Sequence, residues 1–321
     1  MPFGEITLND GHRIPAIAFG TWKIPKEVTP FQVGQAIDVG FDHIDTAQGR
    51  IVYHNEEEVG QAIKESGLSR NQLWVTTKWS GIDGKGARQS IGESLEKLGL
   101  EYLDLYLIHS PQVTKGDIKG AWKELETLQK EGKTKSIGVS KQVYYQTIFF
   151  ASLSDVWDSF NKEQLQELLA HATVKPVVNQ ILLHPYVITR TAPLLEYLEE
   201  QNIVAEGYST LIPLTSRPGG PVDKPVNQIA ERLNVKPEQV LLAWSRAKRA
   251  IPVTTSSRKA RLEGYLDVGD ITLTEDDVKA IDKAGAKGEL WFDCKARFEK
   301  VLIGAVFLIA LIWLFKTYCR H

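Results

Sequence analysis

The chain has 321 residues, of which 43% are hydrophobic and 24% charged, and its formal net charge is −2. This near-neutral balance gives no indication of a nucleic-acid surface, which would need clustered basic residues. Two cysteines, Cys294 and Cys319, are too few for a disulfide framework or a zinc site, so we expect no metal and a reducing compartment. The length suits one large domain with a full core, and the polar first ten residues predict no secretory signal.

Apolar runs alternate with helical patterns along most of the chain. Residues 6–14 alternate around Asp10-Gly11, which predicts a β-hairpin. The predicted strands are Ala16–Trp22, Phe41–Ala47, Leu73–Trp79, Leu103–His109, Thr134–Ser140, Pro176–Ile181, Ile203–Thr210 and Ala250–Thr254. The predicted helices include Asn55–Ser66, Ala87–Leu98, Ile118–Glu131, Lys162–His171 and Ala192–Gln201. Eight strand–helix rounds predict an α/β barrel, and no Gly-x-Gly-x-x-Gly follows a strand, which argues against a dinucleotide-binding doubly wound sheet.

Four reactive side chains lie at or just beyond the ends of three predicted strands. Asp45 is near the end of its strand, Tyr53 lies on the loop before the helix that Asn55 would cap, and Lys78 and His109 end two further strands. The carboxyl ends of parallel strands meet at one edge, so these side chains are expected to converge at one mouth. Taken singly, Asp45 and Lys78 could form a structural ion pair, and His109 could be a hydrogen-bonded core histidine.

Seven segments occur in an order that resembles the aldo-keto reductases. They are LNDGHRIP-x-x-x-FGTW, GFDHIDTA, TTKW, DLYLIHSP, SIGVS, VVNQ-x-x-LHP and IPVTTSS-x-x-x-R. The resemblance runs from about Ile6 to Gly285. It implies a (β/α)8 TIM barrel over residues 1–290, a hairpin that closes the bottom of the barrel, and reduction of carbonyl compounds with NADP(H).

By this resemblance Asp45, Tyr53, Lys78 and His109 are the catalytic residues. A phenol with an ordinary pKa near 10 is a poor acid–base catalyst at neutral pH, and a neighbouring ammonium lowers its pKa. Lys78 would supply that ammonium, Asp45 would hold the lysine, and His109 would orient the carbonyl oxygen. Tyr53 would be the proton donor.

The resemblance also implies a binding site for the cofactor NADPH. Gly20, Thr21 and Trp22 would line the end of the first strand, Tyr208 would stack on the nicotinamide unless it is plain core, and Ser140, Asn179 and Gln180 would hold the carboxamide. Thr254, Ser256, Ser257, Arg258 and Arg261 form a hydroxyl and guanidinium cluster after the last strand. Such donors suit a 2′-phosphate, which favours NADPH over NADH, unless the basic residues are an ordinary helix start.

Two segments depart from the family pattern at the predicted mouth. Eight positions separate Asp45 from Tyr53, whereas the family usually has five, so Gly49–Ile51 is expected to bulge. Lys141–Ser159 stands where the family has an asparagine followed by a helix. This aromatic-rich insertion is either a lid or a retained intron, because unstructured loops longer than about 12–15 residues are uncommon.

The tail, residues 291–321, contains an apolar run without polar side chains at residues 301–315, flanked by basic residues. A helix packed on the barrel would need one polar face, so the run predicts an apolar C-terminal helix that crosses a membrane. The expected protein is then a membrane-anchored enzyme with its catalytic domain in the cytoplasm; which membrane is open.

The leading hypothesis is an NADPH-dependent oxidoreductase that reduces aldehydes and ketones. The segment after His109 is short, which resembles fungal keto-amide and polyketone reductases and predicts bulky or cyclic carbonyl substrates. The alternative is a catalytically weakened barrel that acts as a binding or regulatory subunit at a membrane. The four retained catalytic residues favour the enzyme.

Overall fold

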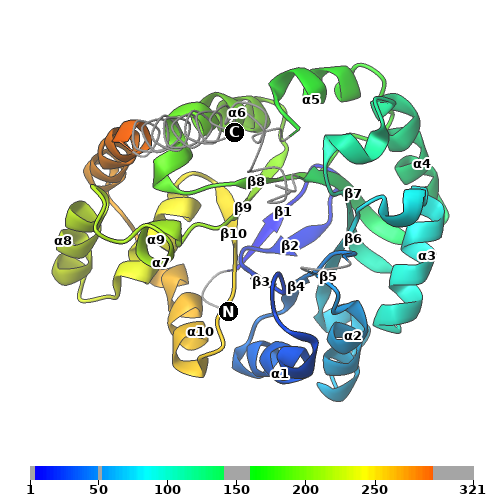
Figure 1. Cartoon of the computed structure of the whole chain (residues 1–321), viewed down its shortest axis with the longest axis horizontal. Coiled ribbons are helices and arrows are strands. Elements are labelled where there is room, and N and C mark those ends of the chain that lie inside the picture. Colours follow the sequence, from blue (N-terminus) through cyan, green and yellow to red (C-terminus); the bar gives the residue numbers. More distant parts are fainter. Residues whose placement is uncertain (1–3, 50–52, 141–159, 292–321) are drawn as a thin grey trace, which may run out of the picture.

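The computed structural model describes residues 4–49, 53–140 and 160–291 of the chain. Eight parallel strands close into a barrel in the order β10-β3-β4-β5-β6-β7-β8-β9, with helices around it (Figure 1). The barrel strands are β3 (Ala18–Gly20), β4 (His43–Asp45), β5 (Trp74–Trp79), β6 (Leu103–Ile108), β7 (Thr134–Ser140), β8 (Val178–Leu182), β9 (Val204–Tyr208) and β10 (Ala250–Thr254). The predicted (β/α)8 barrel is confirmed, although β3, β4 and β9 are shorter than their apolar runs suggested.

The N-terminal hairpin is also confirmed. Strand β1 (Glu5–Thr7) pairs antiparallel with β2 (Arg13–Pro15). Its turn is fastened to the barrel by Asn9, whose side-chain amide donates to the carbonyl oxygen of Pro176 at 2.9 Å. Leu8 and Ile14 pack on apolar side chains of the barrel interior such as Leu105. The hairpin therefore shields this end of the barrel core from water.

The helices form the outer layer of the molecule. They are α1 (Thr29–Val39), α2 (Glu56–Glu65), α3 (Ala87–Leu98), α4 (Ile118–Lys130), α5 (Lys162–Leu169), α6 (Ile188–Glu200), α7 (Ile212–Thr215), α8 (Asp223–Leu233), α9 (Pro237–Ala247) and α10 (Lys259–Leu266). Helix α6 begins four residues earlier than predicted. Pro193 therefore lies inside the helix.

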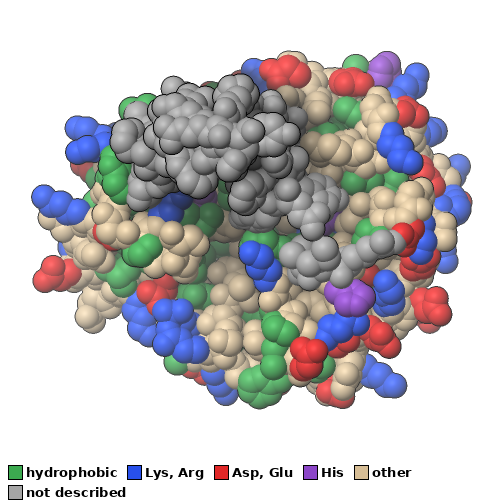
Figure 2. Space-filling view, in the orientation of Figure 1, with side chains coloured by type: hydrophobic (Ala, Val, Ile, Leu, Met, Phe, Trp, Pro, Cys, Tyr) green, Lys and Arg blue, Asp and Glu red, His purple; other side chains and the backbone are tan. Residues whose placement is uncertain are grey.

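Close contacts hold this layer together. A Cβ on Gly60 would lie 2.5 Å from the carbonyl oxygen of Leu98, so α2 approaches the end of α3 only because residue 60 is glycine. On α4, the buried indole of Trp122 donates to the carbonyl oxygen of Val174 at 2.9 Å. Charged side chains of both signs alternate around the rim of the molecule (Figure 2).

Residues 275–291 form a further helix that lies against the barrel (orange in Figure 1). Trp244 of α9 donates its indole N–H to Asp282 at 2.8 Å, and Arg190 of α6 pairs with Glu289 at 3.3 Å. The predicted domain limit at residue 290 falls within this helix. The apolar run at residues 301–315 lies outside the described residues, as do the insertion at 141–159 and residues 50–52.

Candidate active site

A buried ion pair lies at the carboxyl ends of β4 and β5. The ammonium of Lys78 donates to Oδ1 of Asp45 at 2.6 Å and to the carbonyl oxygen of Thr46 at 2.9 Å. Lys78 and Asp45 are 0% and 1% exposed. Burying two charges away from water costs free energy, which is offset only when the partners have good hydrogen-bond geometry. The pair therefore fixes the ammonium at one place in the barrel mouth.

Tyr53 lies over this pair, on the loop between β4 and α2. Its ring centroid is 5.3 Å from Nζ of Lys78 and 5.6 Å from the imidazole of His109, with the two rings edge to face. Burial, followed by the charges of Asp45 and Tyr208, raises the pKa of Tyr53 well above its usual value. The predicted lowering of that pKa by Lys78 is thus wrong, because desolvation dominates.

Asn55 begins α2 as predicted, but its side chain does not cap the helix. Its amide instead donates to the carbonyl oxygens of Thr21 at 3.0 Å and Ile24 at 3.1 Å. The bonds tie the loop after β3 to the loop that carries Tyr53. Asn55 thus helps to place the tyrosine rather than the helix.

His109 follows β6 and is 2% exposed. Its Nδ1 lies 2.6 Å from Oγ of Ser80, whose hydroxyl donates to the carbonyl oxygen of Gln48 at 2.8 Å. Burial, with the charge of Lys78 next, lowers the pKa of His109 well below its usual value, so the ring is neutral. Because the one proton of the Ser80 hydroxyl goes to Gln48, its oxygen accepts a hydrogen bond from Nδ1–H of the neutral ring, and Nε2 carries no proton.

Ser80 was not among the residues singled out from the sequence. It follows Lys78 by two positions, just beyond the end of β5. Period-two alternation along the strand would have placed it beside the lysine. Nothing in the sequence alone, however, showed that His109 of the neighbouring strand would face it.

Ser140 and Gln180 are brought together, because they are direct partners in the pairing of β7 with β8. The Ser140 hydroxyl is buried and has no hydrogen-bond partner within the described part of the chain. Asn179 is not brought to them: its side chain donates to the carbonyl oxygen of Phe160 at 3.2 Å. Neighbouring residues of a strand face opposite sides, which separates Asn179 from Gln180.

The residues predicted to line the end of the first strand lie beside Asp45. Gly20 pairs with Asp45, and a Cβ on it would lie 3.1 Å from Val253. The hydroxyl of the buried Thr21 donates to that of Thr46 at 2.9 Å, whereas Trp22 is only half-buried. The half-buried Tyr208 ends β9, so these residues and Tyr208 lie at the ends of two strands, β3 and β9.

The hydroxyl and guanidinium cluster lies around the loop from β10 to α10. Thr254 is buried at the end of β10, whereas Ser257 and Arg258 are exposed. The hydroxyl of Ser256 accepts the backbone N–H of Arg258 at 3.1 Å. Arg261 points to α9, with its Nε 3.6 Å from a carboxylate oxygen of Glu238. An acid therefore competes for the arginine that a 2′-phosphate would need.

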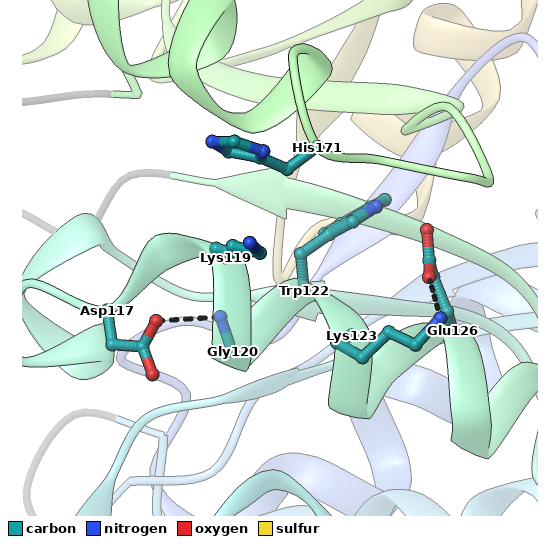
Figure 3. Close-up of a pocket in the computed structure, with 7 residues that line it drawn as sticks. All are labelled: Asp117, Lys119, Gly120, Trp122, Lys123, Glu126 and His171. Atoms are coloured by element: carbon teal, nitrogen blue, oxygen red, sulfur yellow. Dashed lines mark hydrogen bonds and ion pairs between the residues drawn. The ribbon is translucent and has the colours of Figure 1, made fainter.

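Two further hollows lie outside the quartet of Asp45, Tyr53, Lys78 and His109. The first, of about 340 Å³, is formed by α4 and His171, which follows α5 (Figure 3). Asp117 and Lys123 line it, and each already holds a partner, the backbone N–H of Gly120 and Glu126 respectively. The second hollow, of about 330 Å³, lies between α5 and α6. Neither contains a member of the quartet.

Within residues 4–49, 53–140 and 160–291, no group of three or more His, Cys, Asp or Glu side chains is arranged to hold a metal ion. None of the helices in these ranges has the length and apolar character that crossing a bilayer requires. The membrane anchor was predicted for residues 301–315, outside these ranges, and stays a prediction of the sequence.

The sequence of this chain is similar to those of known reductases. The sequence model of the aldo/keto reductase family matches residues 16–286. An NAD/NADP-dependent indole-3-acetaldehyde reductase of Schizosaccharomyces pombe is 35% identical over 284 residues, covering 85% of this chain and 92% of the relative. Methylglyoxal reductase of Yersinia pestis is 33% identical over 279 residues, covering 87% and 91%.

Solved structures agree with this assignment. An aldo-keto reductase of Bombyx mori, in complex with NADP, superposes with a TM-score of 0.75 at 32% identity, covering 87% of this chain and 92% of the other. An aldo/keto reductase of Brucella melitensis gives 0.73 at 33% identity, covering 88% and 99%. The chain therefore belongs to the aldo/keto reductase family, whose members are oxidoreductases.

Proposed function

We propose that the protein reduces aldehyde and ketone carbonyls to alcohols with NADPH. The observation that carries this proposal is the Lys78–Asp45 pair, 2.6 Å between Nζ and Oδ1, buried beneath Tyr53 and beside His109. A phenol, an ammonium and a neutral imidazole around one point at the C-terminal end of a barrel suit proton donation to a carbonyl oxygen.

The donors present suit a nicotinamide cofactor. The Ser140 hydroxyl lacks a described partner although it is buried, and it lies on the strand paired with Gln180. Such an orphan group is costly unless a ligand satisfies it. Ser140 and Gln180 would hold the carboxamide and Tyr208 would cover the ring. When bound, NADPH supplies the hydride that the carbonyl carbon gains.

In the proposed reaction Tyr53 donates its hydroxyl proton to the carbonyl oxygen as negative charge develops there. Its raised pKa keeps that proton on the phenol at neutral pH, and an alkoxide is basic enough to take it. The ammonium of Lys78 then stabilises the phenolate until water reprotonates it. The neutral ring of His109, which lies edge to face with Tyr53, would help to position the carbonyl compound near the Tyr53 hydroxyl.

The preference for NADPH rests on Arg258 and Arg261 beside Thr254 and Ser256. Because Glu238 also pairs with Arg261, we expect measurable use of NADH as well. The relative from Schizosaccharomyces pombe is named for use of both cofactors. Bulky or cyclic carbonyls are the proposed substrates. The segment between β6 and α4 is short and contains only the turn Pro111–Thr114, so it would leave the substrate pocket open.

The test is quenching of NADPH fluorescence by the protein, followed by turnover on a panel of aliphatic, aromatic and cyclic aldehydes and ketones. We expect micromolar binding and NADPH-dependent alcohol formation. Tyr53→Phe is the matched control, because it removes only the hydroxyl. Tight NADPH binding without turnover of any carbonyl would instead favour a binding or regulatory subunit.

A further inference from the structure

A second carboxyl group is buried in the barrel interior, and the proposed reaction does not use it. Glu206 of β9 is 0% exposed. Its Oε2 accepts a hydrogen bond from Nε2 of Gln180 at 2.7 Å. The other oxygen, Oε1, has no hydrogen-bond partner among the described residues, and the nearest ionisable nitrogen, Nε2 of His43, is 4.0 Å away. An isolated buried acid is costly, so its retention calls for a role.

Gln180 is the link between this acid and the catalytic pair. The same amide nitrogen donates at 2.8 Å to Oδ2 of Asp45, whose Oδ1 is held by Lys78. A glutamine amide has two N–H donors, and Asp45 and Glu206 accept one hydrogen bond each from them. Rotating the amide by half a turn would put its oxygen against the Asp45 carboxylate. The side chain therefore has one orientation.

The side-chain carbonyl oxygen of Gln180 remains, and it can only accept a hydrogen bond. No described residue donates to it, and it belongs to the residue paired with Ser140 at the barrel mouth. An acceptor fixed here selects a ligand group that carries N–H donors. A nicotinamide carboxamide has such an amino group, and this step rests on the proposed function.

We propose that Glu206 is a positioning residue that holds the Gln180 amide so that its oxygen accepts a hydrogen bond from the nicotinamide carboxamide. It acts through Gln180 and touches no reacting atom. Without it, Gln180 would keep one bond, to Asp45, and its second N–H would be free to turn toward the cofactor. The side chain would then no longer discriminate between a donor and an acceptor on the ring.

The surrounding charges are consistent with this role. Burial, with the charge of Asp45 next, raises the pKa of Glu206 to about 8. Burial lowers the pKa of His43 to about 3, so this neighbour on β4 is neutral. At neutral pH Glu206 is thus mostly protonated, and its carbonyl oxygen still accepts from Gln180. The holding bond does not require ionisation of the acid.

The experiment compares two oxidised cofactors by isothermal titration calorimetry. In the 3-acetylpyridine analogue of NADP⁺ a methyl ketone replaces the carboxamide, so the analogue has no N–H to donate. If Gln180 accepts from the carboxamide, the parent binds NADP⁺ roughly 10-fold more tightly than the analogue, the value of about one hydrogen bond. Glu206→Met should reduce that ratio to less than about 3-fold. Glu206→Gln, which keeps an acceptor, should retain it.

Binding of 2′,5′-ADP, which lacks the nicotinamide, should be equal in all three proteins and reports an intact fold. A parent that binds NADP⁺ and the analogue equally would overturn the proposal without any variant. An unchanged ratio in a folded Glu206→Met would overturn it as well. If neither NADP⁺ nor 2′,5′-ADP binds the parent, the proposed function itself fails, which is a different result.

Discussion

The two ends of the proposed cofactor site are built differently. At the nicotinamide end, Lys78, Asp45, Gln180 and Glu206 are almost completely buried and joined by hydrogen bonds of 2.6–2.8 Å. At the phosphate end, Arg258 is exposed, and Arg261 has only a partly exposed pair with Glu238. The comparison indicates that the geometry of the chemical step is set before any ligand binds. Cofactor preference instead depends on a solvated loop, where charges are screened and individually worth little.

The largest effect is expected at Tyr53. Tyr53→Phe removes the proposed proton donor and should lower kcat by about 10²–10⁴, the usual contribution of general acid–base catalysis. NADPH affinity should stay within a factor of about 3. Single-turnover rates and fluorescence titrations measure the two quantities. Turnover near that of the parent would show that another group donates the proton.

The second prediction concerns the Lys78–Asp45 pair. Lys78→Met leaves the carboxylate of Asp45 buried without its cation, and loss of one partner from a buried pair typically costs about 3–5 kcal/mol. The free energy of unfolding from urea titration should fall by that amount. The double variant Lys78→Met/Asp45→Leu should recover part of it, because no charge is then stranded. A single variant as stable as the parent would contradict the preformed pair.

A third prediction concerns pH. The pKa of Glu206 is raised from 4.5 to about 8, so the folded protein binds a proton there that the unfolded chain has lost. This contribution makes stability fall as pH rises from about 4.5 to 8, and it is constant below that window. The difference in unfolding free energy between Glu206→Gln and the parent should therefore grow in favour of the variant across this range. A difference that does not change with pH would show that the pKa of the Glu206 carboxyl is not raised in the folded protein.

A smaller effect is expected at Ser80. Ser80→Ala removes the hydroxyl 2.6 Å from Nδ1 of His109, and with it the acceptor that keeps the ring proton on Nδ1. We expect kcat/KM to fall about 10-fold, which corresponds to one lost hydrogen bond. The nitrogen-15 shifts of His109 should show more of the tautomer protonated at Nε2, because Nδ1–H has lost its acceptor. Ser80→Thr retains the hydroxyl and should preserve both measurements.

The smallest effects are expected at the phosphate end. Arg261→Ala should weaken NADPH binding about 5-fold and leave NADH binding unchanged, because a 2′-phosphate would be the ligand of that exposed guanidinium. Glu238→Gln should have the opposite sign, with NADPH bound about 2-fold more tightly. The ratio of the two dissociation constants is the measurement. Equal losses for both cofactors would remove the argument for phosphate recognition.

Sequence patterns were sufficient to predict the architecture and the convergence of the quartet. Eight alternating rounds predicted the barrel, and strands that all run the same way place their carboxyl ends at one edge. Asp45, Lys78 and His109 thus had to share the mouth of the barrel. Local patterning was sufficient because period and order depend on residues near one another in the chain.

Which atoms meet could be seen only in the folded barrel. Burial reverses the pKa shift expected for Tyr53, and strand pleating turns Asn179 away from Gln180. Ser80 and Glu206 meet their partners His109 and Gln180 across neighbouring strands. Each of these depends on desolvation or on the side of a strand that faces the barrel axis. A residue list does not contain those quantities, because they arise only when the sheet closes.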